Sequence, residues 1–224
     1  MKKKTVAVLL ICALFVLTTS GASALPKDTE GIDSAIGVIE ESEYTNEYFG
    51  VGMELPEGWS FLTDEELAQM MNLSIEIVQD EDLAETMREQ MEAGNAITNM
   101  AAKDTLGLRN VNMRLAKVED KTMLSYSEEE ILNLISGTVE SGLEKAGYKN
   151  LSVKIEKTTF VGEEKPVLVI TGEVYSIPVY QYEFLFLGED YYAIVTYTSM
   201  LENHLEEDIT AWYTLEEAEE EAAG

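Results

Sequence analysis

Residues 167–199 read VLVITGEVYSIPVYQYEFLFLGEDYYAIVTYTS, a stretch rich in Val, Ile, Tyr, Phe and Thr. These residue types favour β-strands. Together with the residues just before it, the stretch predicts four strands, at 150–161, 166–176, 178–187 and 191–199. The connections between them are short, and short connections require antiparallel neighbours. We therefore expect an antiparallel meander with one covered face.

Two capping boxes mark helix starts upstream of the meander. Thr63 with Glu66, and Ser127 with Glu130, have the spacing at which each side chain satisfies the free backbone amide of the other residue. Another helix is predicted between them from about Asp80. The helix that begins at Ser127 carries an apolar stripe closed by a glycine: Leu132, Ile135, Val139, Leu143 and Gly147.

The remaining segments complete the domain. Residues 96–103 and 110–118 alternate in polarity around a turn and predict two antiparallel strands. After the meander, an apolar stripe predicts a terminal helix docked on the sheet: Leu201, Leu205, Ile209 and Trp212. We expect one α+β domain from about 44 to 214, in which an antiparallel β-sheet is backed by helices.

The amino terminus has the three parts of a secretory signal peptide. Three lysines precede an unbroken apolar run from Val6 to Leu17, and Ala22-Ser23-Ala24 offers small residues at a cleavage site. We predict a signal peptide over 1–24 and a secreted or extracytoplasmic protein. The short Lys-rich start is typical of bacterial signals.

Two alternatives to cleavage fit the sequence less well. A lipid anchor would use Cys12, but Ile11 stands where a small residue is needed. An uncleaved membrane anchor would need about 20 apolar residues, and the run is shorter. We therefore expect no transmembrane segment after signal cleavage. On either side of the domain we expect a flexible acidic spacer over 25–43 and an acidic tail over 215–224.

The chain is strongly acidic, with 15 Lys plus Arg against 43 Asp plus Glu and a net charge of −28. Nucleic-acid binding is excluded because phosphates are bound by clustered Lys and Arg. Cleavage after Ala24 would remove three Lys and no acidic residue, which gives a net charge of −31. The single Cys would also be lost, so the mature protein needs no disulfide to fold.

Charge is unevenly distributed along the mature chain. Residues 25–102 contain 2 basic and 19 acidic residues, residues 103–165 contain 10 and 11, and residues 166–224 contain none and 13. One interpretation is a least negative face formed by Arg109, Arg114, Lys117, Lys149, Lys154 and Lys157. The other is that these cations pair with nearby carboxylates.

The segment that opens the domain combines an aromatic-glycine step with a proline-glycine turn before a tryptophan: Tyr48, Phe49, Gly50, Leu55, Pro56, Gly58 and Trp59. With these residues the segment resembles the PsbP-like α/β sandwich superfamily. Here the Phe precedes the first glycine, whereas in the family's motif it follows it. The resemblance implies a PsbP-like α-β sandwich, and its implied relatives are non-enzymatic, among them exported bacterial proteins of unknown role.

No catalytic, cofactor-binding or metal-binding residue is predicted. His204 is the single imidazole, and its position four residues before Asp208 fits a surface pair on a helix. The clusters Asp80-Glu81-Asp82 and Glu206-Glu207-Asp208 fit a solvated face better than a calcium or manganese site, because adjacent helical acids point in different directions.

Two apolar patterns allow both a structural and a binding interpretation. Tyr180, Tyr182, Phe184 and Phe186 share one face of a strand, which fits an inner face packed under the helices or the wall of a ligand groove. The methionines of the first two helices fit adaptable core or a partner surface: Met70, Met71, Met87 and Met91.

We therefore expect an exported, non-enzymatic accessory or binding protein of the cell envelope or extracellular space, with a protein partner and no cofactor. The first alternative is an acidic protein that binds divalent cations such as calcium or manganese. The second is an unrecognised carboxylate hydrolase, which needs two acids with separated pKa values in one pocket.

Overall fold

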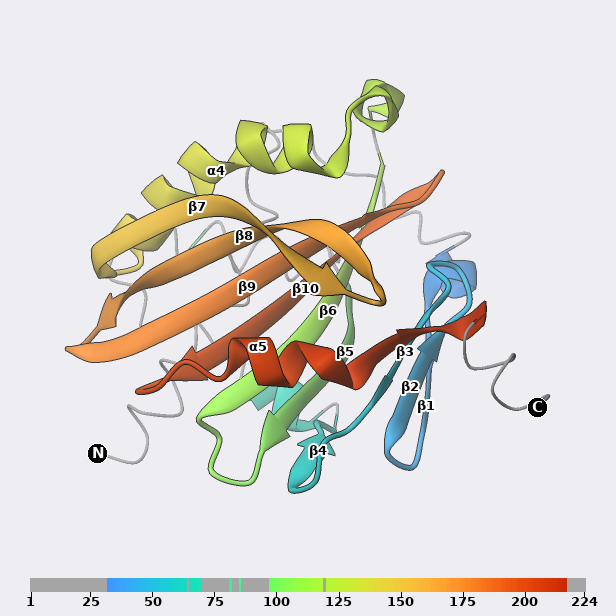
Figure 1. Ribbon diagram of the computed structural model, residues 1–224, viewed down its shortest axis with the longest axis horizontal. Coiled ribbons are helices and arrows are strands. Elements are labelled where there is room, and N and C mark those ends of the chain that lie inside the picture. The colour runs from blue at the N-terminus through green and yellow to red at the C-terminus, as the bar shows by residue number, and fades with distance from the viewer. Residues whose placement is uncertain are drawn as a thin grey trace.

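The chain forms two antiparallel β-sheets that face each other (Figure 1). The computed structural model describes residues 32–63, 65–69, 81, 85, 97–118 and 120–216. Within these residues the smaller sheet has the order β1 (Val38–Glu40), β2 (Glu43–Asn46), β3 (Val51–Glu54) and β11 (Trp212–Thr214). The larger sheet has the order β4 (Trp59–Phe61), β5 (Ile97–Asp104), β6 (Arg109–Lys117), β10 (Tyr191–Met200), β9 (Ile177–Leu187), β8 (Glu163–Val174) and β7 (Lys149–Phe160).

The predicted meander is confirmed as β7 to β10, in which each strand pairs antiparallel with the next. Two of its turns consist of residue pairs with positive φ: Val161 (48°) with Gly162 (79°), and Tyr175 (52°) with Ser176 (63°). Two-residue turns of this handedness match the right-handed twist of the flanking strands. The predicted strands at 96–103 and 110–118 are also confirmed, because β5 pairs antiparallel with β6.

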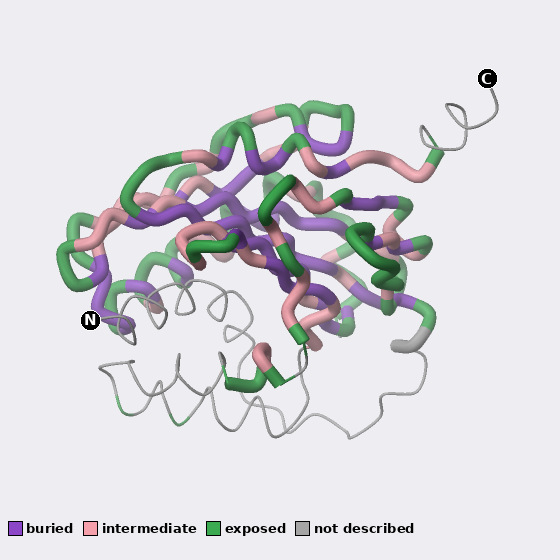
Figure 2. Tube along the Cα trace, turned by 90° about the horizontal axis from the view of Figure 1, so that it is seen from below, coloured by how far each residue is buried: buried purple, intermediate pink, exposed green. Residues whose placement is uncertain are grey.

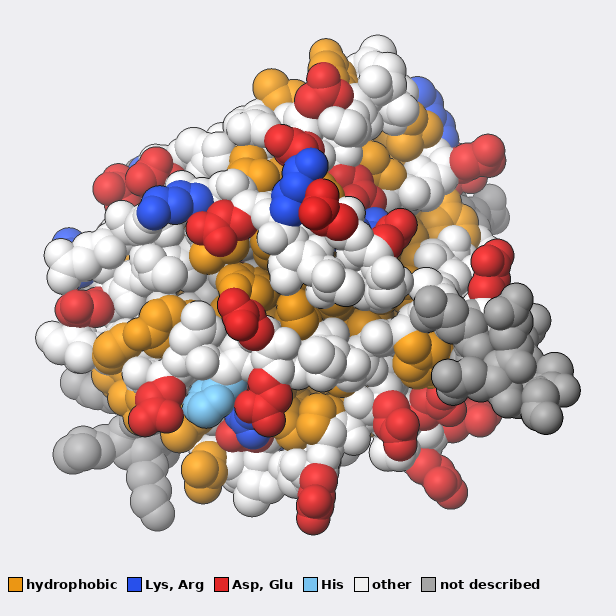
Figure 3. Space-filling model, in the orientation of Figure 1, with side chains coloured by type: hydrophobic (Ala, Val, Ile, Leu, Met, Phe, Trp, Pro, Cys, Tyr) orange, Lys and Arg blue, Asp and Glu red, His pale blue; other side chains and the backbone are white. Residues whose placement is uncertain are grey.

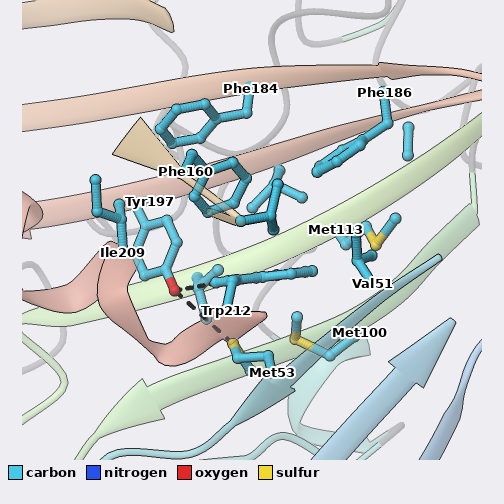
Figure 4. Packing of buried hydrophobic residues seen from close by; sticks show 14 of the residues in the cluster. Val51, Met53, Met100, Met113, Phe160, Phe184, Phe186, Tyr197, Ile209 and Trp212 are labelled. Carbon is cyan, nitrogen blue, oxygen red and sulfur yellow. Dashed lines mark hydrogen bonds between the residues drawn. The ribbon is translucent and has the colours of Figure 1, made fainter. Parts of the chain in front are cut away.

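Apolar side chains from both sheets meet in one cluster, which we call the inter-sheet core (Figure 4). Figure 2 shows the buried residues along the strands in the interior of the molecule. Trp212 comes from the small sheet, and its indole N–H donates to the Tyr197 hydroxyl of the large sheet at 2.7 Å. Phe160 stacks on Phe184, with ring centroids 3.8 Å apart. The meander is therefore covered on the face that carries these aromatic rings.

The opposite face of the large sheet is covered by α4 (Glu128–Lys145). Its start is the predicted capping box, in which Glu130 N–H donates to Ser127 Oγ and Ser127 N–H donates to the Glu130 carboxylate. At its end, Tyr148 N–H donates to Leu143 O, and Gly147 has a φ of 102°. These features confirm the predicted glycine cap. The meander therefore has two covered faces, so the prediction of a single covered face was wrong.

The predicted fold class was wrong. An α+β domain with a sheet backed by helices was expected, whereas the structure is β-rich and one sheet covers the inner face of the other. Among the described residues, α4 is the one long helix. The prediction failed because it assigned the apolar segment that contains Trp212 to a helix docked on the sheet. In the structure Trp212–Thr214 is β11, which pairs with β3, and β3 in turn pairs with β2.

The terminal helix is also shorter than predicted. It consists of α5 (Leu205–Asp208) and the 3-10 turn η3 (Ile209–Ala211), after which Trp212 is extended and pairs with Met53. Leu201 has a φ of 69°, which excludes it from a right-handed helix. The apolar spacing of three to four residues predicted that the helix continues to Trp212, but Trp212 forms a strand because it pairs with β3.

The two predicted segments outside the domain are described only in part. Within the expected spacer, a 3-10 turn, η1 (Ile32–Ala35), is followed by β1, and Ala35 is fully buried. The domain therefore extends to the amino-terminal side of Tyr44. The signal peptide over 1–24 and residues 217–224 of the tail lie outside the described residues, as does most of the predicted helix from Asp80. The capping box of Thr63 and Glu66 is present.

Candidate functional site

A group of mostly buried polar side chains lies on the face of the large sheet that α4 covers, among apolar side chains. We call this cluster the polar island. Its members are Asn110, Asn112 and Arg114 of β6, Thr196 and Thr198 of β10, and Gln181 and Glu183 of β9. All except Arg114 are buried, and Arg114 is partly buried.

Strand register aligns these residues across three strands. Glu183 lies opposite Thr196, which in turn lies opposite Asn112. Gln181, Thr198 and Asn110 form the neighbouring row in the same way. Because side chains two residues apart share a face of a strand, both rows point to the same side of the sheet.

Some polar groups of the island satisfy one another. Gln181 Nε2 donates to Thr198 Oγ1 at 3.3 Å, and Asn112 Nδ2 donates to the backbone oxygen of Thr196 at 3.4 Å. Three buried oxygens of the island, however, have no hydrogen-bond partner within the described part of the chain: Asn112 Oδ1, Gln181 Oε1 and Glu183 Oε2. A buried acceptor without a donor costs about 1 to 3 kcal/mol. The three oxygens therefore destabilise the fold unless another molecule pairs with them.

The charges in the island are strongly perturbed. Glu183 is only 1% exposed, and burial raises its pKa to about 8, although the positive charge of Arg114 opposes this shift. Burial lowers the pKa of Arg114 to about 10, a value that still leaves it charged at neutral pH. Glu183 is therefore mostly a neutral carboxylic acid at pH 7, able to donate a hydrogen bond.

The island thus combines amide oxygens, a neutral carboxyl, a hydroxyl row and one positive charge. Such a set can recognise a small molecule that donates through hydroxyl or amino groups and is neutral or carries one negative charge. A cluster of buried polar groups with a perturbed pKa is a candidate functional site.

A second polar cluster lies on the opposite face of the large sheet, beside α5. Arg109 Nη1 donates to Asp208 Oδ1 at 2.8 Å, and its Nε lies 3.6 Å from Asp104 Oδ2. The guanidinium also lies over the ring of Trp59. Burial raises the pKa of Asp208 to about 6, and the charge of Arg109 opposes this shift.

His204 does not form the predicted pair with Asp208. Its ring nitrogens lie 3.6 Å from a carboxylate oxygen of Glu202 and 3.9 Å from one of Glu207. Figure 3 shows the imidazole between acidic side chains at the surface. Asp208 instead turns toward Arg109, because α5 is a single turn that begins after His204.

The six basic residues proposed as one face are not brought together. Arg109 and Arg114 project from opposite sides of β6, because successive side chains alternate between the two faces of a strand and four residues lie between them. Lys157 lies within 3.6 Å of Glu129 and 3.8 Å of Glu164. For Arg109 and Lys157, pairing with nearby carboxylates is the interpretation that holds.

The aromatic row is part of the inter-sheet core. Phe184 and Phe186 are buried there, and Tyr182 is nearly so. Its structural interpretation is therefore confirmed in part, with the correction that the small sheet, and not helices alone, covers the row. The methionines at positions 70, 71, 87 and 91 lie outside the described residues.

The predicted acidic clusters do not converge. In Glu206-Glu207-Asp208 the first two residues are exposed while Asp208 is buried against Arg109. Asp80-Glu81-Asp82 lies mostly outside the described residues. In the part of the chain that is described, no three His, Cys, Asp or Glu side chains are grouped to hold a metal ion. Divalent-cation binding stays a prediction.

The two buried acids with strongly raised pKa values do not form a catalytic pair. Glu183 lies on the α4 side of the sheet and Asp208 on the side of the inter-sheet core. One glycosidic bond cannot contact both, because the sheet separates them.

The polar island was missed at the sequence level. A local signal was present, since Gln181 with Glu183 and Thr196 with Thr198 interrupt apolar strands at a period of two residues. The alternation of Asn110 and Asn112 on β6 has the same period. Their convergence depends on register between strands that are distant in sequence.

Comparison of the sequence with protein-family models and with curated proteins found no match. Within the described residues, no helix is both long and apolar enough to cross a membrane.

Proposed function

We propose that the chain is an exported, non-catalytic binding protein of the cell envelope or extracellular space that holds a small polar ligand on the polar island. The observation that carries this proposal is the group of buried oxygens without donors: Asn112 Oδ1, Gln181 Oε1 and Glu183 Oε2. Polar groups are rarely buried unpaired unless they have a function. A ligand with hydroxyl or amino groups would supply the donors.

The other parts of the proposal have separate support. Export rests on the signal-peptide pattern before residue 25. The proposed absence of catalysis is supported by the separation of Glu183 and Asp208 on two faces of the sheet. Arg114 and the neutral Glu183 favour a ligand that is neutral or singly anionic over a cation.

Thermal unfolding of the mature protein tests the ligand site. The probes are glucose, gluconate and glutamine, which carry hydroxyl, amino or amide donors without net positive charge, and spermidine, a polycation. We expect saturable stabilisation by one or more of the first three and none by spermidine at matched ionic strength.

Substitutions test whether ligand-induced stabilisation depends on the polar island. Asn112→Leu removes one acceptor at similar volume and should abolish the ligand-induced shift, whereas Asn133→Leu changes an exposed residue of α4 and should leave the shift intact. Circular dichroism checks that both variants fold. The proposal is wrong if none of the three probes stabilises the protein, or if Asn112→Leu responds like the parent chain.

A further inference from the structure

The outer strand of the small sheet exposes apolar side chains along an edge that has no strand neighbour among the described residues. Within the described residues, β1 has a strand neighbour on one side only, which is β2. Ile36 is 41% exposed, Val38 is 55% exposed and Ile39 is 43% exposed. We call these residues together with Glu40 the β1 edge. An exposed apolar edge strand is a template for pairing with another extended chain.

The β1 edge is held firmly from behind. Gly37 N–H donates to Asn99 Oδ1 at 3.1 Å, and the Ala35 oxygen accepts from Asn46 Nδ2 at 2.9 Å. A side chain at Gly37 would collide with the Tyr44 ring, because an added Cβ would lie 2.5 Å from it. The edge therefore needs little ordering when it binds, which lowers the entropic cost of association.

The sequence in and around the β1 edge is acidic. Glu40, Glu41 and Glu43 are exposed on β1, on the following turn and at the start of β2. The sequence from 28 to 87 contains no Lys or Arg at all. An approaching strand is therefore favoured when it carries positive charge.

We propose that the β1 edge docks an extended segment of another protein in which apolar residues alternate with Lys or Arg. The segment adds a fifth strand to the small sheet, so its backbone pairs with β1 while its cations face the glutamates. A second copy of this chain is disfavoured as the occupant, because it would place glutamates against glutamates across the new strand pair. This surface is independent of the polar island.

Synthetic peptides test the proposal directly. One peptide alternates Val with Lys, a second alternates Val with Glu, and a third has Pro in place of the central Val of the first. Fluorescence anisotropy with the mature protein should show saturable binding of the first peptide, and affinities lower by about tenfold or more for the other two. The Pro peptide keeps the charge, so it separates strand pairing from simple attraction.

Substitutions in the protein test whether the peptide binds at the β1 edge. Val38→Lys/Ile39→Lys should weaken binding of the Val/Lys peptide by about tenfold or more, through lost apolar contact and repulsion. The matched control is Leu106→Lys/Leu134→Lys, which adds the same charge at two exposed leucines elsewhere and should preserve binding. Hydrogen exchange should show new protection confined to residues 36–40.

Three outcomes would overturn the proposal. The first is that the Pro peptide binds as tightly as the Val/Lys peptide, and the second is that the two double variants bind the Val/Lys peptide with equal affinity. The third is that sedimentation shows a dimer of the mature protein and that Val38→Lys/Ile39→Lys dissociates this dimer. The last result would assign the β1 edge to a second copy of the chain.

Discussion

The phenol ring of Tyr48 covers the backbone of Gly188, at the turn between β9 and β10. A Cβ added at Gly188 would lie 2.3 Å from the Tyr48 ring. The Tyr48 hydroxyl also accepts hydrogen bonds from Asp190 N–H at 2.9 Å and Tyr191 N–H at 3.2 Å. One side chain from the β2–β3 connection thus joins the small sheet to the meander.

Removing this link should weaken the fold. Tyr48→Phe keeps the ring but leaves two backbone amides without their acceptor, which should cost about 1 to 2 kcal/mol of unfolding free energy. Gly188→Ala should cost a similar amount because the Tyr48 ring must move. Urea unfolding measures both. Tyr126→Phe, at an exposed tyrosine, is the control, and a Tyr48→Phe loss no larger than the control's would contradict this role.

The pH dependence of the unfolding free energy should reveal the ionisation of Glu183. Its pKa is about 8 in the folded protein, against an ordinary value of 4.5. The folded protein therefore keeps a proton that the unfolded chain releases, and stability falls as pH rises from about 4.5 to 8. The slope due to this group is on the order of 1 kcal/mol per pH unit.

Glu183→Gln isolates that slope. The variant cannot ionise, so its stability advantage over the parent should grow with pH across this window. Any contribution of Asp208 is present in both proteins and cancels in the difference. Unfolding free energies of the two proteins that remain parallel from pH 5 to pH 8 would show that Glu183 has no raised pKa.

The inter-sheet core should depend strongly on Trp212. Its ring packs against Phe160 and Tyr44, and its indole N–H donates to the Tyr197 hydroxyl. Trp212→Ala should cost about 3 to 5 kcal/mol by opening a cavity, and Trp212→Phe should cost less. Denaturant unfolding followed by circular dichroism tests this order. Equal losses in the two variants would show that ring packing contributes little.

The capping box of α4 should stabilise the helix measurably. Ser127→Ala removes the side-chain acceptor for Glu130 N–H and should cost about 1 kcal/mol. Thr138→Ala, at an exposed position inside the same helix, should have a much smaller effect. Similar losses for both would contradict a specific contribution of the cap.

Features that depend on neighbouring residues were predictable from the sequence. Ser127 and Glu130 are three residues apart, so their capping box is a local signal, and the meander follows from alternation between short turns. The pairing of Trp212 with Met53 joins positions at opposite ends of the domain, and no local pattern encodes it. The apolar spacing before Trp212 therefore predicted a helix, whereas Trp212 begins a strand.

The polar island shows the same limit for the site. Each strand reveals that Gln181, Thr198 or Asn110 interrupts an apolar face, yet only the register of β6, β9 and β10 brings them together. The missing donors of Asn112 and Gln181 become visible only when the neighbours of each atom are known.

The small sheet is built from both ends of the domain, because β11 completes a sheet begun by β1, β2 and β3. The ribosome delivers the chain from its amino terminus, so Met53 emerges long before Trp212. The inter-sheet core cannot close until residues 212–214 have emerged. Folding of the domain is thus delayed until nearly all of it has been synthesised.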